Sequence, residues 1–496
     1  MPPVEQIYAE NLKLQEKVLK LERQVEWLKG KLFGAGQGET MDRAQMLLQL
    51  EILERTQRET EKVKIEYERA AKRSEKSDTD ADRYAKLPVA ETIVIEPEEV
   101  KLQPHLYERI GEERTFELDV QDPKIVKREI VRPKYRHVVE RSLPPVVAPA
   151  PARAVPGGHV SSGLISWILI GKYVDHLPLF RLEKQTQRMG CRISRQTMSD
   201  AVERGAELLG LIHGHMRVEL MGEGYVQVDE TPVRCQDPDV PGRTAEGWLW
   251  GMSHPKGDVV FQWRMSRRHA EALSLLRGYK GLMQSDGYAA YAEVGEQNPG
   301  ITRVGCWAHA RRKFTDVLKY APLHAGFVLR LIGHLYAMER SWDEEEWSPV
   351  QRAHLRRRDM AMTLSLLNRV AKRMLERHTP KSPMGEAAGY LLRQWDVLVA
   401  HLEHGETRLD NNLMENAIRP TAIGKKNWLF IGHPDAGQRS AVIYSIVVSC
   451  QRRGIDPLVY LRDVLGRLPG MTTKDDIAAL TPRNWALAHA SATTAA

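Results

Sequence analysis

The chain contains few cysteines: among its 496 residues there are four, Cys191, Cys235, Cys306 and Cys450. These thiols are too few and too scattered to form the framework of a disulfide-rich secreted domain. Long apolar runs are also missing, since residues 164–170 are interrupted by Ser166 and fall far short of the ~20 residues that span a bilayer. The first residues lack the basic and apolar regions of an export signal. We therefore expect a cytoplasmic protein with no membrane partner.

A large charge excess is missing as well. The chain has 72 Lys and Arg against 65 Asp and Glu, a net charge of +7, with 42% apolar and 28% charged residues. This composition excludes wholesale disorder, and the length allows roughly three domains at ~150 residues each. The mildly basic balance suggests nucleic acid as a partner, but its sign alone decides nothing until the charges are located.

The N-terminal segment, residues 1–34, has the pattern of a coiled coil. Apolar residues and one asparagine recur with alternating four- and three-residue spacing at Ile7, Asn11, Leu14, Val18, Leu21, Val25, Leu28 and Leu32. That period gives a narrow seam facing a partner helix, where a buried asparagine fixes the register. The pattern predicts a leucine zipper that forms a homo-oligomer. The alternative is a helix packed on its own domain.

The next segments change character several times. Residues 35–80 predict a charged helix, residues 81–142 a small β-rich module, and residues 143–162 a stiff Pro-rich linker. Residues 163–218 predict two helices joined by a Gly-containing turn, with Ser194 as the N-cap of the second. This outline is typical of a helix-turn-helix, in which Arg195, Gln196 and Ser199 would read base edges. Ordinary helix packing is the alternative.

Residues 219–320 and 405–450 predict a mixed α/β sheet domain. Three strands lie within residues 225–264, followed by a helix, a strand, a helix and a strand up to residue 307. A helical insertion is expected at residues 321–404 and a helical tail at residues 451–496. The expected fold class is therefore a multi-domain α+β protein with a mixed α/β core.

Three carboxylates stand out in this region. Asp229 and Asp286 each close an apolar strand and precede a turn signal, and Glu415 lies on a helix that Asp410 would cap and Pro420 would stop. A carboxylate at the end of a buried strand is costly unless it is paired, and a divalent metal is its natural partner. The alternatives are turn or capping duty for the aspartates and a solvated Glu415–Arg419 pair for the glutamate.

Basic residues follow this helix and alternate with aromatic residues and glycines. Arg419, Lys425, Lys426 and Arg439, interleaved with Trp428 and Phe430, suit a phosphodiester backbone and unstacked bases. The alternative is a basic strand edge. A second basic tract at residues 352–358, continued at Arg369, Lys372, Arg373 and Arg377, predicts either another DNA-facing surface or a solvated helix face.

Several segments resemble the transposases of insertion sequence family 66. They are YVQVDET (225–231), SDGY (285–288), GCWAHARRKF (305–314), DNNLMENAIRP (410–420), KNWLFIG (426–432), KYVDHLPLFR (172–181) and GIDPLVYL (454–461). The resemblance covers nearly the whole chain. It implies an RNase H-like catalytic core with a DDE triad at Asp229, Asp286 and Glu415. Asp229 would bridge two Mg²⁺ or Mn²⁺ ions per active site, and the other two carboxylates would each hold one.

The same resemblance implies the substrates and the setting. The expected partners are DNA, namely the transposon terminal inverted repeats and target DNA, and possible companion proteins of the element. The setting would be the bacterial cytoplasm, associated with the nucleoid. His309, in a Cys-x-x-His that resembles a motif of other DDE transposases, is a candidate for supporting the active site, and so is Asn412 on the face of Glu415. The alternative for His309 is a hydrogen bond at a helix start.

One departure from the family concerns zinc. Relatives carry paired cysteines before the linker, whereas this chain has none before Cys191, so zinc is unlikely there. Cys306 and His309 have a spacing that zinc could use, but no partner pair accompanies them.

Two other functions stay open. One is a metal-dependent nuclease or resolvase that cuts without joining, and the other is a domesticated DNA-binding protein. The intact triad argues against the second.

Overall fold

The computed structural model describes residues 125–126, 134–135, 146–147, 151–156, 158–255, 257–472 and 474–494, all within one compact unit, Leu118–Ala496. The predicted coiled coil, the charged helix and most of the β-rich module lie outside these residues, so these predictions remain predictions. Two short strands, β1 (Lys134–Tyr135) and β2 (Val146–Val147), pair antiparallel. The second lies in the predicted Pro-rich linker.

The predicted helix-turn-helix outline is present as helices. These are α5 (Ser162–Tyr173), α6 (Leu179–Arg188) and α7 (Arg195–Met221). As predicted, Ser194 caps α7, with its hydroxyl accepting the Thr197 N–H at 3.1 Å. However, α7 is 27 residues long, and its C-terminal half, through Ile212 and Met216, is buried in the same hydrophobic core as the sheet. These three helices therefore share the hydrophobic core of the sheet and have no separate core of their own.

The mixed sheet has five strands in the order β5-β4-β3-β6-β7. Their bounds are β3 (Tyr225–Gln236), β4 (Thr244–Ser253), β5 (Val259–Arg264), β6 (Gly281–Gln284) and β7 (Ile301–Val304). The first three form an antiparallel meander, whereas β6 and β7 run parallel to β3. The crossover helices are α8 (His269–Leu275) and α9 (Ala289–Gln297). These elements confirm a mixed α+β architecture.

The expectation that β3 ends at Asp229 with a turn is wrong. The strand continues through Pro232 to Gln236 and stays paired with β4. Pro232 is tolerated because β6 pairs with β3 only as far as Gln227, so the edge beyond has no sheet partner that needs an N–H. On that edge Lys425 Nζ donates to the Pro232 carbonyl at 3.0 Å. Asp229 is therefore a mid-strand residue.

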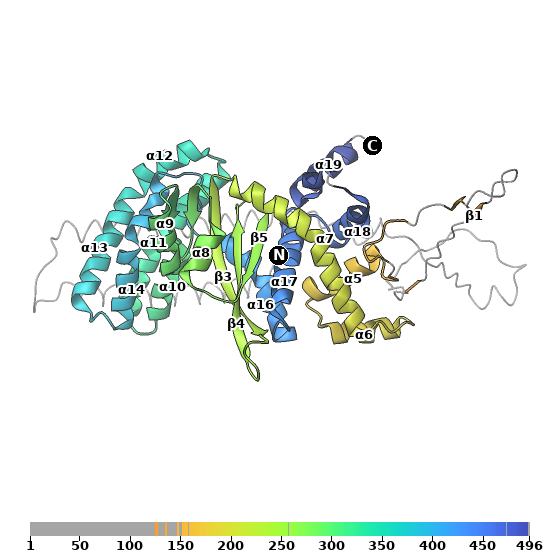
Figure 1. Ribbon diagram of the computed structural model, residues 1–496. Helices are drawn as coiled ribbons and strands as arrows, with labels where there is room; N and C mark the ends of the chain where they lie inside the picture. Colours follow the sequence, from red (N-terminus) through yellow and green to blue (C-terminus); the bar gives the residue numbers. More distant parts are fainter. Residues whose placement is uncertain are drawn as a thin grey trace, which may run out of the picture. The chain divides into compact units, whose positions relative to one another are not determined.

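Helices cover both faces of the sheet (Figure 1). Successive residues of a strand point to opposite faces, and β4 shows which helix lies on which face. Trp250 meets Tyr291 of α9 edge to face, with ring centroids 6.2 Å apart. Next to it, a Cβ on Gly251 would lie only 2.1 Å from Met414 Cε, so α16 (Asn412–Trp428) covers the other face at close approach.

A group of helices between residues 307 and 402 has a hydrophobic core of its own (Figure 1). Its members are α10 (Trp307–Val317), α11 (Pro322–Glu344), α12 (Pro349–Asp359), α13 (Ala361–Arg377), α14 (Pro383–Arg393), α15 (Trp395–Val399) and the short 3-10 turn η2 (Ala400–Leu402). The predicted helical insertion was residues 321–404. Helices α11 to α15 lie within it, but α10, which was expected in the sheet domain, belongs to the same hydrophobic core.

The arginines at residues 352–358 form salt bridges with acidic residues of the same helical group or next to it. Arg356 is 0% exposed and ion-paired with Glu339, and Arg352 pairs with Glu339 and Asp343. Arg357 and Arg358 form exposed pairs with acidic neighbours. The hypothesis of a second DNA-facing surface is therefore wrong for the two buried arginines, because salt bridges within the bundle use their charge.

The chain then returns to the sheet through α16 and α17 (Pro434–Arg452), which pack on β3, β4 and β5. It ends with α18 (Pro457–Arg467), η3 (Leu468–Gly470), η4 (Ile477–Leu480) and α19 (Pro482–Thr494). The prediction that Pro420 stops the helix is wrong, since α16 continues past it to Trp428. Burial of Met414, Ala417 and Thr421 against the core outweighs the ~3 kcal/mol that an internal proline costs. No helix in the described ranges is long and apolar enough to cross a bilayer.

Candidate active site

The strand register places Asp229 and Asp286 next to each other. β3 and β6 run parallel, and their last matched pair is Gln227 and Gln284. Each aspartate lies two residues beyond its glutamine, so both aspartates lie just past the same end of the β3–β6 pairing. Asp229 is opposite Gly251 in β4, which puts its side chain on the face that α16 covers.

Buried glutamines attach the start of α16 to these two strands. Gln227 Nε2 donates to Gln284 Oε1 at 2.8 Å and to the Asp410 carbonyl at 2.9 Å. Gln284 Nε2 donates to the Arg408 carbonyl at 2.7 Å, and Asn411 Nδ2 donates to the Val228 carbonyl at 3.0 Å. The segment at 408–411 is thereby fixed beside the strands that bear the aspartates, although it is more than 120 residues away in sequence.

Glu415 follows in the first turn of this helix. The N-cap is Asn411 rather than the predicted Asp410, but Asp410 Oδ1 still accepts the Asn412 N–H at 3.2 Å. Burial, followed by the negative charges of Glu230, Asp286 and Glu415, raises the pKa of Asp229 well above its usual range. Asp286 and Glu415 are thus both close enough to Asp229 to affect its ionisation.

The donor atoms of this group fit a divalent cation. Asp229 Oδ1 accepts the Glu230 N–H and Asp286 Oδ1 accepts the Tyr288 N–H, both at 2.9 Å, while neither Oδ2 has a hydrogen bond among the described residues. Glu415 Oε1 is buried without a hydrogen-bond partner in the same part of the chain. Oxygen donors crowded together at a cost in charge repulsion are the ligand set that Mg²⁺ and Mn²⁺ prefer.

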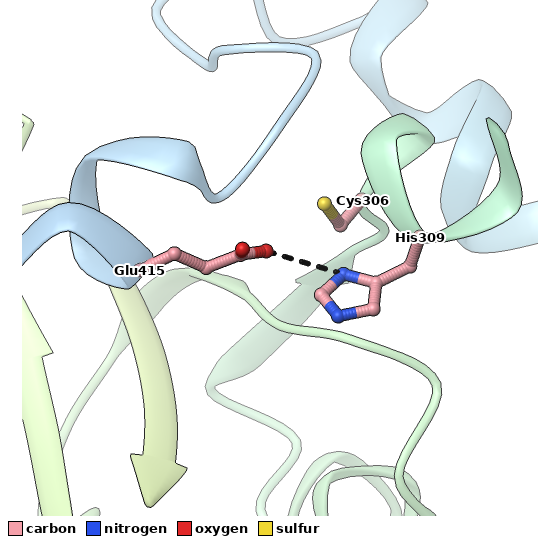
Figure 2. A group of neighbouring side chains, drawn as sticks. All are labelled: Cys306, His309 and Glu415. Atoms are coloured by element: carbon pink, nitrogen blue, oxygen red, sulfur yellow. Dashed lines mark ion pairs between the residues drawn. The ribbon is translucent and has the colours of Figure 1, made fainter. Parts of the chain in front are cut away.

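Figure 2 shows a second group around Glu415, formed with Cys306 and His309. The ligand atoms of these three residues lie within 4.8 Å of one another. His309 Nδ1 is 3.8 Å from Glu415 Oε1, and Arg312 Nη2 is 3.2 Å from Oε2. Burial raises the pKa of the Cys306 thiol to about 12, and its sulfur accepts the Asn411 N–H at 3.3 Å. Zinc binds the thiolate, so a zinc ion at this group would have to displace the thiol proton.

The comparisons with known proteins agree with this geometry. The family model described as "Transposase IS66 family" matches residues 157–439, more than half of the chain, and the IS66 C-terminal element matches residues 445–483. The chain belongs to the IS66 transposase family. Membership implies a DNA-processing enzyme that binds DNA.

Curated relatives of this transposase include two proteins of Sinorhizobium fredii. The uncharacterized protein y4qI is 32% identical over 396 residues, which are 76% of this chain and 72% of that protein. The uncharacterized protein y4jD is 29% identical over 401 residues, 76% of each chain.

No hydrogen bond or ion pair among the described residues joins the side chains of the remaining predicted site residues of the transposase to the three carboxylates. Asn412 is exposed, and its side chain makes no hydrogen bond to the triad within the described residues. Arg195 pairs with Glu183 at 3.4 Å and Gln196 Nε2 donates to Asp200 at 2.7 Å, while Ser199 is half-buried on the same turn of α7. These contacts lie at the exposed N-terminal end of α7. They do not test whether that end reads DNA bases, which stays a prediction.

The basic residues of α16 and α17 differ in whether their side chains are exposed or already bonded within the fold. Arg419 and Lys426 are exposed, whereas Lys425 is bonded to Pro232. Arg439 is ion-paired with Glu203 and links α17 to α7. Of the four predicted DNA contacts in this tract, Arg419 and Lys426 are therefore the two most accessible to phosphates.

Sequence reasoning missed the polar residues that support the site. Gln227, Gln284 and Asn411 are fully buried, and Glu230 forms an ion pair with Arg267 at 2.6 Å on the opposite face of the sheet. The available signal was polar side chains within otherwise apolar strands, at YVQVDE and GLMQ. A buried amide must find hydrogen-bond partners, so each of these positions indicated a contact still to be located.

Proposed function

We propose that this protein is a DDE transposase with an RNase H-like core, which cleaves DNA at insertion-sequence ends and joins the freed 3′-OH to target DNA. The mixed sheet with helices on both faces supports the RNase H-like part. The observation that carries the proposal is the parallel register of β3 and β6, which sets Asp229 beside Asp286, together with the charge of Glu415 acting on Asp229.

Asp229, Asp286 and Glu415 would hold two Mg²⁺ or Mn²⁺ ions. When bound, the ions would supply Lewis-acid polarisation of the phosphate and make the attacking oxygen a stronger nucleophile. The protein contributes no covalent nucleophile. In the first step water forms a bond to phosphorus and the element's 3′ oxygen leaves, and in the second that 3′-OH attacks a target phosphate and displaces the target's 3′ oxygen.

Other residues of the chain would bind and orient the DNA. Arg419 and Lys426 on α16 would neutralise phosphates near the scissile bond. Arg312 lies against Glu415 and would keep the glutamate in place while balancing its charge.

Triad variants test the proposal. Asp229→Asn, Asp286→Asn and Glu415→Gln should each lower cleavage of a labelled element-end duplex by at least ~10³-fold while end binding stays within about threefold, because the DNA-facing surface is unchanged. Asp239→Asn, an exposed aspartate in the β3–β4 turn, is the matched control and should cleave like the wild type.

A target plasmid in the same reaction separates the rival functions. Joined products support the transposase, and cleavage without joining would indicate a nuclease or resolvase. Normal strand transfer by Glu415→Gln would contradict the assignment of that residue.

A further inference from the structure

Helix α16 ends in a strained turn. Leu429 has φ 69° and ψ −48°, and the Phe430 N–H donates to the Trp428 carbonyl at 2.8 Å. This is a γ-turn with positive φ at its centre, the rarer and more strained kind. A positive φ in a leucine is a true outlier, whereas glycine would adopt it without cost.

The residues on either side are anchored in the fold. Trp428 is half-buried against Gly424, where a Cβ would lie 2.8 Å from the indole Nε1. Ile431 is buried and bridges to β3, donating to the Arg234 carbonyl and accepting the Gln236 N–H, both at 2.8 Å. Strained turns persist where their surroundings over-determine them, and here both ends of the turn are held within four residues.

The two residues between these anchors are large, apolar and exposed. Leu429 is 66% and Phe430 37% exposed. The strained backbone at Leu429 therefore does not bury these two side chains against the described part of the chain. Cationic residues lie close to the turn. Lys426 is exposed in the last turn of α16, and Arg234 of β3, whose carbonyl accepts the Ile431 N–H, is exposed as well.

Exposed apolar side chains flanked by cations match one kind of DNA contact. Proteins that kink DNA insert such residues between base pairs, while basic neighbours bind the phosphates. A protein partner would offer no reason for the cations. We propose that Leu429 and Phe430 form an apolar wedge that unstacks base pairs of the element-end DNA, an inference that rests on the proposed function for its substrate.

The helix also sets where the wedge would act. Glu415 lies in the first turn of α16 and Trp428 is its last residue. At 1.5 Å per residue the two are about 20 Å apart along the axis, which corresponds to about six base pairs of duplex at 3.4 Å each. The unstacked step should therefore lie within about six base pairs of the phosphate that is cleaved.

Fluorescence of 2-aminopurine tests the proposal. The full-length protein is bound, with metal withheld, to end duplexes carrying the probe at successive positions. We expect at least a threefold rise in fluorescence at one step within six base pairs of the cleavage site. Leu429→Ala and Phe430→Ala should abolish most of this rise while end binding weakens less than fivefold. Leu323→Ala, which is as exposed but lies on α11, should retain it.

Leu429→Gly separates the wedge from a purely structural turn. It should melt at the same or a higher temperature, because glycine relieves the positive φ, yet lose the fluorescence rise. An unchanged rise in Leu429→Ala and Phe430→Ala would overturn the wedge. A wild-type protein that cleaves and joins DNA without unstacking would overturn the wedge and leave the proposed function standing. Unstacking by a protein that does not cleave DNA in Mg²⁺ would overturn the proposed function and leave the wedge standing.

Discussion

Single side chains show how this fold accommodates charge where it is costly. Burial, followed by the charges of neighbouring acidic residues, raises the pKa of Asp229 well above its usual range. A folded-state pKa above the unfolded value means that ionisation of Asp229 weakens the metal-free fold as pH rises through that range. A bound divalent cation would offset this cost, so stability and metal binding are coupled at this residue.

His401 provides a pH test at the same scale. It is buried, with Nε2 2.9 Å from the Gly305 carbonyl and Nδ1 2.8 Å from Thr407 Oγ1. Burial, followed by the charge of Arg356, lowers its pKa to about 3. The folded protein therefore keeps His401 neutral, while the unfolded chain takes up a proton below about pH 6.5. The contribution of His401 to stability is complete above that pH and is lost as pH falls toward 3.

We expect the free energy of unfolding to fall by about 2 kcal/mol between pH 7 and pH 5 through His401 alone. Denaturant unfolding at several pH values measures this. His401→Gln should flatten the pH dependence by that amount, whereas the exposed His215→Gln should keep the wild-type slope. Equal slopes in wild type and His401→Gln would contradict the prediction.

At the scale of elements, the sequence predicted those whose pattern is local. The N-cap of α7 at Ser194 was predicted to the residue, because capping depends on near neighbours. The length of β3 and the continuation of α16 past Pro420 were not. Both depend on which edge or face meets a distant segment, and no local pattern contains that information.

The candidate site likewise has residues that the sequence predicted and contacts that it did not. Asp229, Asp286 and Glu415 were predicted from apolar strand patterns, a helix start and the family resemblance, and their role stays a prediction. The contacts that bring Glu415 to the aspartates were not, since Gln284 and Arg408 are 124 residues apart. Burial of Arg356, which also bonds the carbonyls of His401, His404 and Thr407 just before this segment, was equally unforeseen.

Gln284→Met tests whether the glutamine contacts position the helix. The change leaves the Arg408 carbonyl without a buried donor, at about 1–3 kcal/mol, whereas the Gly305 carbonyl keeps its contact with His401. We expect a lower melting temperature and at least a tenfold loss of cleavage, although all three carboxylates remain. Gln297→Met, on the exposed surface of α9, is the control and should change neither. Full activity in Gln284→Met would show that α16 is held without Gln284, by its packing and by the Gln227 and Asn411 hydrogen bonds.

At the scale of the whole molecule, the proposed function requires that two DNA ends meet. The described unit contains all three carboxylates, but paired-end cleavage needs at least two copies of them. The heptad seam at residues 7–32 is the segment whose pattern predicts association. Leu14, Leu21 and Leu28 occupy every second seam position, so replacing all three by alanine removes buried contacts worth about 2–5 kcal/mol each, by analogy with core truncations.

We expect this triple variant to lose self-association and paired-end complexes while a single end still binds, because the DNA contacts proposed here lie in another part of the chain. Light scattering measures the mass and a gel-shift assay with two labelled ends measures pairing. Alanine at Glu16, Lys20 and Arg23, which lie off the seam, should leave both unchanged. If the leucine variant keeps the wild-type mass, another surface joins the copies. That outcome would favour the alternative reading of residues 1–34, a helix packed on its own domain.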